Sequence, residues 1–212
     1  MSTRAPRIAA LIAVVLVALA SSVRAQVFYS FPGARPVTDS SPALGLVAGF
    51  GDNVVRLGGF GRFNLSPATD LGLEVMYDNA DAEGTGGDDV GFFGFGGDGK
   101  YLLFPADEGM PLDIAAQAGV GLMSRSDFTL IHVPLGGIAS HDFLTKDGRR
   151  ITPYGGAYLL FDYLKVNDDS STDFDLEMRV GASAEIVKRG SLFAAFHAGN
   201  GTMFFLGFNA GL

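Results

Sequence analysis

The chain has 212 residues, of which 18% are charged, and it carries a formal net charge of −8 with no cysteine. The charged fraction is below the roughly 25% of a typical soluble domain, and the mean hydropathy is positive at +0.27. The lack of cysteine excludes a disulfide framework and any cysteine-based metal or lipid attachment. The acidic balance argues against a nucleic-acid partner, which would require a basic surface.

Residues 1–25 have the pattern of a secretory signal peptide. Arg4 and Arg7 precede an apolar run at 8–20, which is short for a membrane-spanning helix, and small residues close the stretch at Ala25. We predict cleavage after Ala25, which removes three arginines and no acid and leaves a net charge of −11. An uncleaved anchor helix is the alternative. Residues 26–42 are rich in proline and glycine and predict an irregular lead-in.

From residue 43 to the end at 212, apolar and polar residues alternate in segments separated by turn residues. In 173–186 every even position is apolar and every odd position is charged or small, and Val187 ends the segment. A strand places successive side chains on opposite faces, so the segment predicts a strand with one apolar and one charged face. The same pattern recurs and predicts about ten strands, with eight as the alternative count: 43–50, 54–65, 70–78, 90–104, 112–123, 128–143, 151–166, 173–187, 191–198 and 202–212.

The predicted fold class is all-β, a transmembrane antiparallel up-and-down β-barrel over residues 43–212. The segment 173–187 is long enough for a tilted strand that crosses a bilayer, which needs about 9–11 residues. Charges such as Arg62, Glu74 and Arg179 lie in mid-strand, where a membrane barrel has a wet lumen and a lipocalin-type barrel has an apolar one. These charges favour the membrane barrel. A water-soluble sandwich or lipocalin-like carrier is the structural alternative, because in water the apolar faces would form a core.

With its signal peptide, its alternating strands and its C-terminal segment 204–212, the chain resembles small bacterial outer-membrane β-barrel proteins of the OmpA-barrel or OmpW-like kind. The resemblance implies the outer membrane as the location, outer-membrane lipid and the barrel-insertion machinery as partners, and a monomeric state. Such proteins commonly end in an aromatic residue, whereas this chain ends in Leu212 with Phe208 further in. The resemblance carries no functional motif, and fold alone does not determine function.

Two patterns suggest ligands. The glycine-rich stretch 94–100 resembles a phosphate-binding loop, but the sequence after it predicts a strand where such loops need a helix, so we expect no cofactor. The acidic stretch at 81–89 has oxygen ligands that suit a weak cation site, although its spacing does not match a calcium-binding loop. Its candidate ligands are Asp81, Glu83, Asp88 and Asp89.

The charges on the predicted inner face are the main candidate site. A charge inside a barrel must be hydrated or paired. We therefore expect a salt-bridged network that fills and stabilises the lumen, or else a narrow cation-preferring pore that passes small ions. The predicted network comprises Arg56, Arg62, Glu74, Asp98, Lys100, Asp162, Glu177 and Arg179.

The function expected from these features is that of an outer-membrane barrel with a structural, surface-interaction or limited passive-permeability role. No nucleophile and base are placed together by the sequence, so we expect no enzyme and no metal centre. The alternative is a membrane-embedded lipid-modifying enzyme or protease, which would depend on a histidine such as His132 or His197.

Overall fold

The computed structural model describes residues 33–37, 42–51, 53–80, 90–106, 110–126, 128–199 and 201–212. The described residues form eleven strands. They are β1 (Ala43–Gly51), β2 (Val54–Ser66), β3 (Thr69–Ala80), β4 (Val90–Phe104), β5 (Asp113–Arg125), β6 (Phe128–Ser140), β7 (Phe143–Leu144), β8 (Arg150–Val166), β9 (Asp169–Val187), β10 (Gly190–Ala198) and β11 (Thr202–Gly211).

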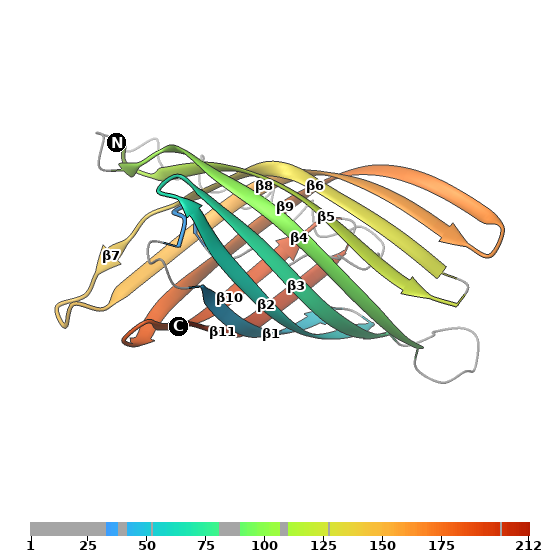
Figure 1. Cartoon of the computed structure of the whole chain (residues 1–212), viewed down its shortest axis with the longest axis horizontal. Coiled ribbons are helices and arrows are strands. Elements are labelled where there is room, and N and C mark those ends of the chain that lie inside the picture. Colours follow the sequence, from blue (N-terminus) through green and yellow to red (C-terminus); the bar gives the residue numbers. More distant parts are fainter. Residues whose placement is uncertain are drawn as a thin grey trace, which may run out of the picture.

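Ten of these strands close into an antiparallel up-and-down barrel (Figure 1). Neighbours in the chain pair with each other, and the ring closes between β1 and β11, where Ala43 lies opposite Gly211. β6 pairs directly with β8, so the two-residue strand β7 pairs only with the edge of β8 and lies outside the ring. We call the end of the barrel where β1 begins and β11 finishes the terminus end, and the opposite end the far end.

The predicted fold class is confirmed, with ten strands in the ring and not eight. One predicted loop is wrong. Residues 167–172 were expected to form a loop, but β8 and β9 continue to a turn of two residues, with Val166 opposite Asp169. Both faces of this hairpin tip are exposed. Because both faces are exposed there, an apolar residue is favoured on neither of them. The alternation of apolar and polar residues is therefore lost, although the hydrogen-bonded pairing of the two strands continues.

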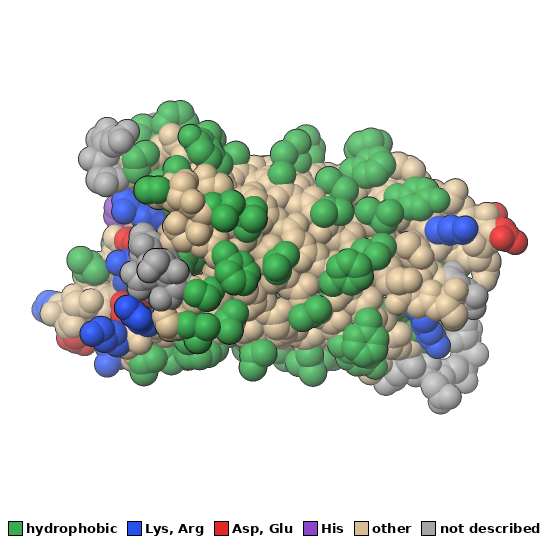
Figure 2. All heavy atoms as spheres, in the orientation of Figure 1, with side chains coloured by type: hydrophobic (Ala, Val, Ile, Leu, Met, Phe, Trp, Pro, Cys, Tyr) green, Lys and Arg blue, Asp and Glu red, His purple; other side chains and the backbone are tan. Residues whose placement is uncertain are grey.

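The outer surface of the barrel is apolar along its length. Leu46, Phe93 and Phe174 are more than 70% exposed, at 71%, 73% and 75%, and Figure 2 shows hydrophobic side chains spread over the visible wall, with the charged ones at its two ends. An apolar exterior of this extent is stable when lipid covers it. In the described part of the chain, no helix has the length and apolarity needed to cross a membrane.

Aromatic side chains lie near both ends of this apolar wall. Near the far end Tyr77 packs on Phe93 with ring centroids 5.0 Å apart, and Phe161 packs on Phe174 at 5.1 Å. Near the terminus end Tyr101 is 54% exposed on the outer face of β4. Aromatic rings favour the interface between the hydrocarbon and the headgroups of a bilayer. These two zones lie where a membrane barrel has its two aromatic girdles.

The inner face has an apolar part and a charged part. The wall made by β1, β10, β11 and the adjoining part of β2 is largely apolar, with Phe60, Phe193 and Phe205 buried in one cluster. The rings of Phe60 and Phe193 lie 5.9 Å apart. The buried acidic side chains and the buried arginine and lysine side chains lie on β2 to β5 and on β9. The packed aromatic wall narrows the space in which those charges meet.

Candidate functional site: the charged lumen

The strand alternation places the eight predicted network residues on the inner face of the barrel. Arg56, Arg62, Lys100, Glu177 and Arg179 are each at most 3% exposed, whereas Asp98, Asp162 and Glu74 are somewhat more accessible. These residues do not form a single cluster. The structure joins most of them into one group across the middle of the lumen and places Arg56 and Asp162 in two separate side-chain pairs.

Arg62 is the centre of the main group. Its Nη1 donates to Asp70 and its Nη2 donates to Asp98 at 2.5 Å, so one guanidinium bridges β3 and β4. The Lys100 Nζ lies 3.6 Å from the second oxygen of Asp70. A guanidinium presents several donors in a fixed plane, which suits this role of holding two carboxylates at once.

Gly72 makes the contact between Arg62 and Asp98 possible. It lies between them in the row of cross-strand neighbours, opposite Arg62 on β2 and opposite Asp98 on β4. A Cβ atom on Gly72 would lie 2.3 Å from an Asp98 oxygen and 2.7 Å from the Arg62 Nη2. The missing side chain therefore leaves the space through which the ion pair forms.

From Asp98 the polar contacts continue to the other side of the barrel. The Gln117 amide donates to Asp98 at 2.8 Å, and the Tyr158 hydroxyl donates to the Gln117 oxygen at 2.7 Å. Tyr158 is on β8, and its hydrogen bond to β5 passes in front of the intervening strand β6. The chain of contacts thus leaves the wall of the barrel and spans part of the lumen.

Arg179 completes this chain. Its guanidinium carbon lies 4.0 Å from the centre of the Tyr158 ring, and its Nε donates to Glu177. Glu74 adds an attractive electrostatic interaction from β3, which is five positions away from β9 around the ring of ten. We use the name lumen cluster for this group: Arg62, Asp70, Asp98, Lys100, Gln117, Tyr158, Glu177 and Arg179.

Two further side-chain pairs lie in the lumen. Arg56 and Asp78 are cross-strand neighbours on β2 and β3, each 1% exposed, and they form a bidentate pair with both contacts at 2.6 Å. The His132 Nδ1 lies 2.5 Å from Asp162, which is its direct neighbour on β8. These pairs satisfy charges that would be costly to bury alone.

Part of the lead-in also lies inside the lumen, at the terminus end. Residues 33–37, which we call the N-terminal segment, have no regular secondary structure. The Ala34 N–H donates to the Ser140 hydroxyl at 2.8 Å, and the Arg35 Nε donates to Asp113 at 2.9 Å. Lys100 donates to the carbonyl oxygens of Gly33 and Arg35 at 2.8 and 3.1 Å.

The other end of the N-terminal segment is held by the opposite side of the charged wall. The Val37 N–H donates to Asp70 at 3.1 Å, and the Asn64 amide donates to the Val37 carbonyl at 2.5 Å. The segment therefore contacts five consecutive strands, β2 to β6, through side chains that also belong to the lumen cluster or adjoin it. It closes part of the lumen at the terminus end.

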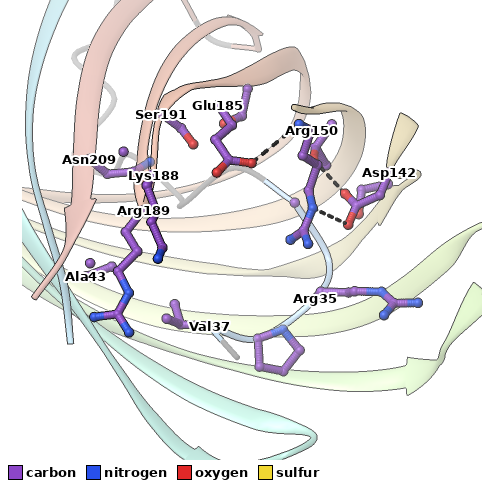
Figure 3. A pocket seen from close by; sticks show the side chains of 17 residues that line it. Arg35, Val37, Ala43, Asp142, Arg150, Glu185, Lys188, Arg189, Ser191 and Asn209 are labelled. Atoms are coloured by element: carbon purple, nitrogen blue, oxygen red, sulfur yellow. Dashed lines mark hydrogen bonds and ion pairs between the residues drawn. The ribbon is translucent and has the colours of Figure 1, made fainter. Parts of the chain in front are cut away.

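Among the described residues, a vestibule of about 470 Å³ opens at this end (Figure 3). It is lined by the N-terminal segment on one side and by the ends of β8 to β11 on the other. Its charged lining residues are Arg35, Asp142, Arg150, Glu185, Lys188 and Arg189.

Sequence reasoning missed several members of the site. The predicted network omitted Asp78, although it shares its inward parity with Glu74, so the alternation alone could have assigned it. It also omitted Tyr158, which was counted with neither face. The position of Arg35 carries no such signal, because no periodicity relates the lead-in to the strands.

The predicted cation loop of Asp81, Glu83, Asp88 and Asp89 lies outside the described residues, as does the predicted signal peptide. Within the described residues, no group of three or more histidine or acidic side chains is arranged to hold a metal ion. His197, the second histidine considered for catalysis, packs against Phe205 with ring centroids 4.6 Å apart and lies 3.8 Å from Glu177.

No protein-family model matches the chain, and no curated protein sequence matches it. Among solved structures, the chain is similar to the β-domain of the Bordetella autotransporter BrkA, with 13% identity, a TM-score of 0.55, and coverage of 81% of this chain and 99% of that one. It also matches the KdgM porin, at 12% identity and a TM-score of 0.41, with coverage of 80% and 99%.

A third match is the N-terminal β-barrel domain of Pseudomonas aeruginosa OprF, at 13% identity and a TM-score of 0.35, with coverage of 82% and 98%. At identities this low a structural match is evidence of the fold alone. The BrkA β-domain, with a TM-score of 0.55, is the match on which the fold comparison rests. Together with the closed ring, the apolar exterior and the charged interior, it shows that this chain has the fold of a bacterial outer-membrane β-barrel.

Proposed function

We propose that the protein is a structural outer-membrane barrel whose lumen is closed at rest. The observation that supports this is the lumen cluster, which runs from Asp70 on β3 to Glu177 on β9 through side-chain contacts inside the barrel. Inward side chains can fill the interior of a small barrel. Here the aromatic wall and the N-terminal segment reduce the remaining space further.

The proposal includes export by a cleaved signal peptide at residues 1–25, insertion by the barrel-assembly machinery and a monomeric state. It gives the paired charges a stabilising role. Exchange of both partners for apolar side chains can be neutral, but removal of one partner of a buried pair is strongly destabilising, because the other charge stays buried. In this barrel Arg56, Arg62 and Arg179 are buried cations whose loss would leave buried carboxylates.

The test is single-channel recording of the refolded mature protein in planar bilayers. We expect the wild-type protein to be inserted and electrically silent. The variant Arg179→Ala, which removes the group that connects Tyr158 to Glu177, should show small cation-selective steps, because it opens space and leaves the carboxylates of Glu74 and Glu177.

Arg150→Ala is the matched control, since it also removes one arginine but lies at the 53% exposed rim of the vestibule. It should remain silent. Discrete steps of the same size in the wild type, in Arg179→Ala and in Arg150→Ala would overturn the proposal, and would favour the narrow cation-preferring pore. Insertion is checked independently by the β-sheet circular dichroism spectrum and by resistance to unfolding in dodecyl sulfate.

A further inference from the structure

Strand β9 continues at the far end beyond its neighbour β10. The pairing of the two strands ends where Met178 lies opposite Ala198, whereas β9 runs on to the hairpin turn and stays paired with β8 on its other side. Gly199 still adjoins residues 176–177 of β9. Among the described residues, no strand lies beside residues 169–175 on the β10 side, and the hairpin projects from the barrel (Figure 1). We use the name open edge for this stretch.

The backbone of the open edge presents hydrogen-bonding groups to its surroundings. The Leu176 carbonyl oxygen points to the β10 side, where a Cβ on Gly199 would lie 3.2 Å from it. The backbone groups of an antiparallel strand alternate between its two sides, so Ser170, Thr172 and Phe174 direct their N–H and C=O groups to the same side as Leu176. A row of such groups at the edge of a sheet is a template for an added strand.

The open edge lies on the water side of the aromatic girdle at the far end. Phe174 packs on Phe161 in that girdle, and the residues from Asp169 to Thr172, which lie beyond it, are polar and exposed. Hydrocarbon does not tolerate such a row of backbone groups, but water does. Proteins commonly protect an edge with lysine, proline or a bulge. The open edge has neither lysine nor proline, and its register with β8 is unbroken.

The charge of this hairpin tip favours one kind of occupant. Residues 167–175 contain four acids and no base, and Asp169, Asp173 and Asp175 lie on one face of β9 because they share its alternation. The Oδ2 atom of Asp175 is buried and accepts no hydrogen bond from the described residues. Two copies paired through this edge would bring acids beside acids, which is destabilising, whereas a strand with a base at every second position would bring opposite charges together.

We propose that the open edge binds an extended segment of another protein as an added β-strand, and that this segment carries lysine or arginine at every second position. In strand addition the backbone hydrogen bonds give the affinity and the alternate side chains give the specificity. The acids of the open edge select the charge of the partner and at the same time oppose pairing with a second copy of this chain. On the other face the partner meets Ser170, Thr172 and the exposed ring of Phe174.

The test uses two fluorescein-labelled peptides of equal length and charge, one of alternating lysine and threonine and one of alternating lysine and proline. Proline cannot donate to a strand ladder, so the second peptide keeps the charge and loses the backbone pairing. Binding to the refolded mature protein in neutral detergent, at low ionic strength, is followed by fluorescence anisotropy. We expect saturable binding of the lysine–threonine peptide at one site per barrel, and binding of the lysine–proline peptide that is weaker by about tenfold or more.

The variant Asp169→Asn/Asp175→Asn should weaken binding of the lysine–threonine peptide by about threefold or more. The matched control is Asp142→Asn/Asp147→Asn, which changes the net charge equally at the terminus end and should bind as the wild type does.

The absence of saturable binding to the wild type would overturn the inference, and so would equal affinities for the two peptides or equal affinities of the two double variants, which would indicate attraction by net charge alone. A wild-type dimer that the lysine–threonine peptide dissociates in sedimentation experiments would assign the open edge to a second copy and would overturn it as well. Peptide binding does not depend on whether the lumen conducts, so its outcome is separate from that of the bilayer recordings.

Discussion

Oppositely charged side chains pair in two regions of this barrel, and the two regions differ in how far water reaches the pairs. In the lumen cluster, Arg62 is 1% exposed and bridges two carboxylates, one of which is itself fully buried. In the vestibule, Arg150 is 53% exposed and lies 3.3 Å from a single carboxylate that is 28% exposed. Water screens the second pair but not the first, so similar contacts differ several-fold in their effect on stability.

The same contrast separates buried from exposed pairs. Charges in the lumen cluster have partners within the barrel and hold its walls together. The Arg150–Asp142 pair of the vestibule is partly exposed, so it contributes less to stability. The predictions below test this contrast by removing one feature at a time, from the strongest expected effect to the weakest.

The largest effect is expected for Arg62→Ala. The substitution leaves Asp70 and Asp98 in the lumen without the cation that bridges them, which should lower the free energy of unfolding by about 3–5 kcal/mol. The measurement is urea unfolding of the barrel in lipid vesicles, followed by fluorescence or circular dichroism. A decrease in the free energy of unfolding below about 1 kcal/mol would mean that the lumen cluster stabilises the barrel no more than an exposed ion pair of the vestibule does.

Gly72→Ala should disrupt the same ion pair without removing a charge. The added Cβ would lie 2.3 Å from an Asp98 oxygen, and we expect a loss of about 1–3 kcal/mol. The control is Gly99→Ala on the neighbouring strand, where a Cβ would meet only a Leu71 methyl at 3.5 Å. Equal unfolding midpoints for the two variants would show that the space over Gly72 is not required.

Tyr158→Phe tests the part of the lumen cluster that crosses the barrel. It removes the hydroxyl that donates to Gln117 at 2.7 Å and keeps the ring under Arg179. The unsatisfied amide oxygen should cost about 1–2 kcal/mol. Tyr101→Phe makes the same chemical change on the lipid-facing wall and should cost less. A larger loss of stability for Tyr101→Phe than for Tyr158→Phe in parallel unfolding experiments would contradict the hydrogen bond from Tyr158 across the lumen to Gln117.

The smallest effect is expected for Arg150→Ala in the vestibule. Its pair with Asp142 is exposed, so its loss should change stability by less than about 1 kcal/mol. What change there is should fade as salt is raised from about 0.01 to 1 M, since the screening length falls from about 30 to 3 Å. A large effect that persists in high salt would mean that the vestibule stabilises the barrel as the lumen cluster does.

Much of the fold could be predicted because a strand that separates lipid from a wet lumen must alternate. Residues 173–187 show this most clearly, and the alternation assigned Arg62, Lys100 and Arg179 to the inner face. It failed at residues 169–172, where both faces of the hairpin meet water. It also could not recognise that Gly72 is a required gap, because glycine is common along the whole chain.

The sequence by itself determined the all-β class, the inner and outer faces of the strands and the types of charge inside, because each follows from a local period of two residues; ring closure decided between ten and eight strands. Only the tertiary structure decided which charges meet. The register between β2, β3 and β4 brings Arg62, Gly72 and Asp98 into one row, and closure of the ring brings Tyr158 within reach of Gln117. The entry of residues 33–37 into the lumen was likewise decided by long-range contacts, since the lead-in has no period and its partners lie 27 to 106 residues away.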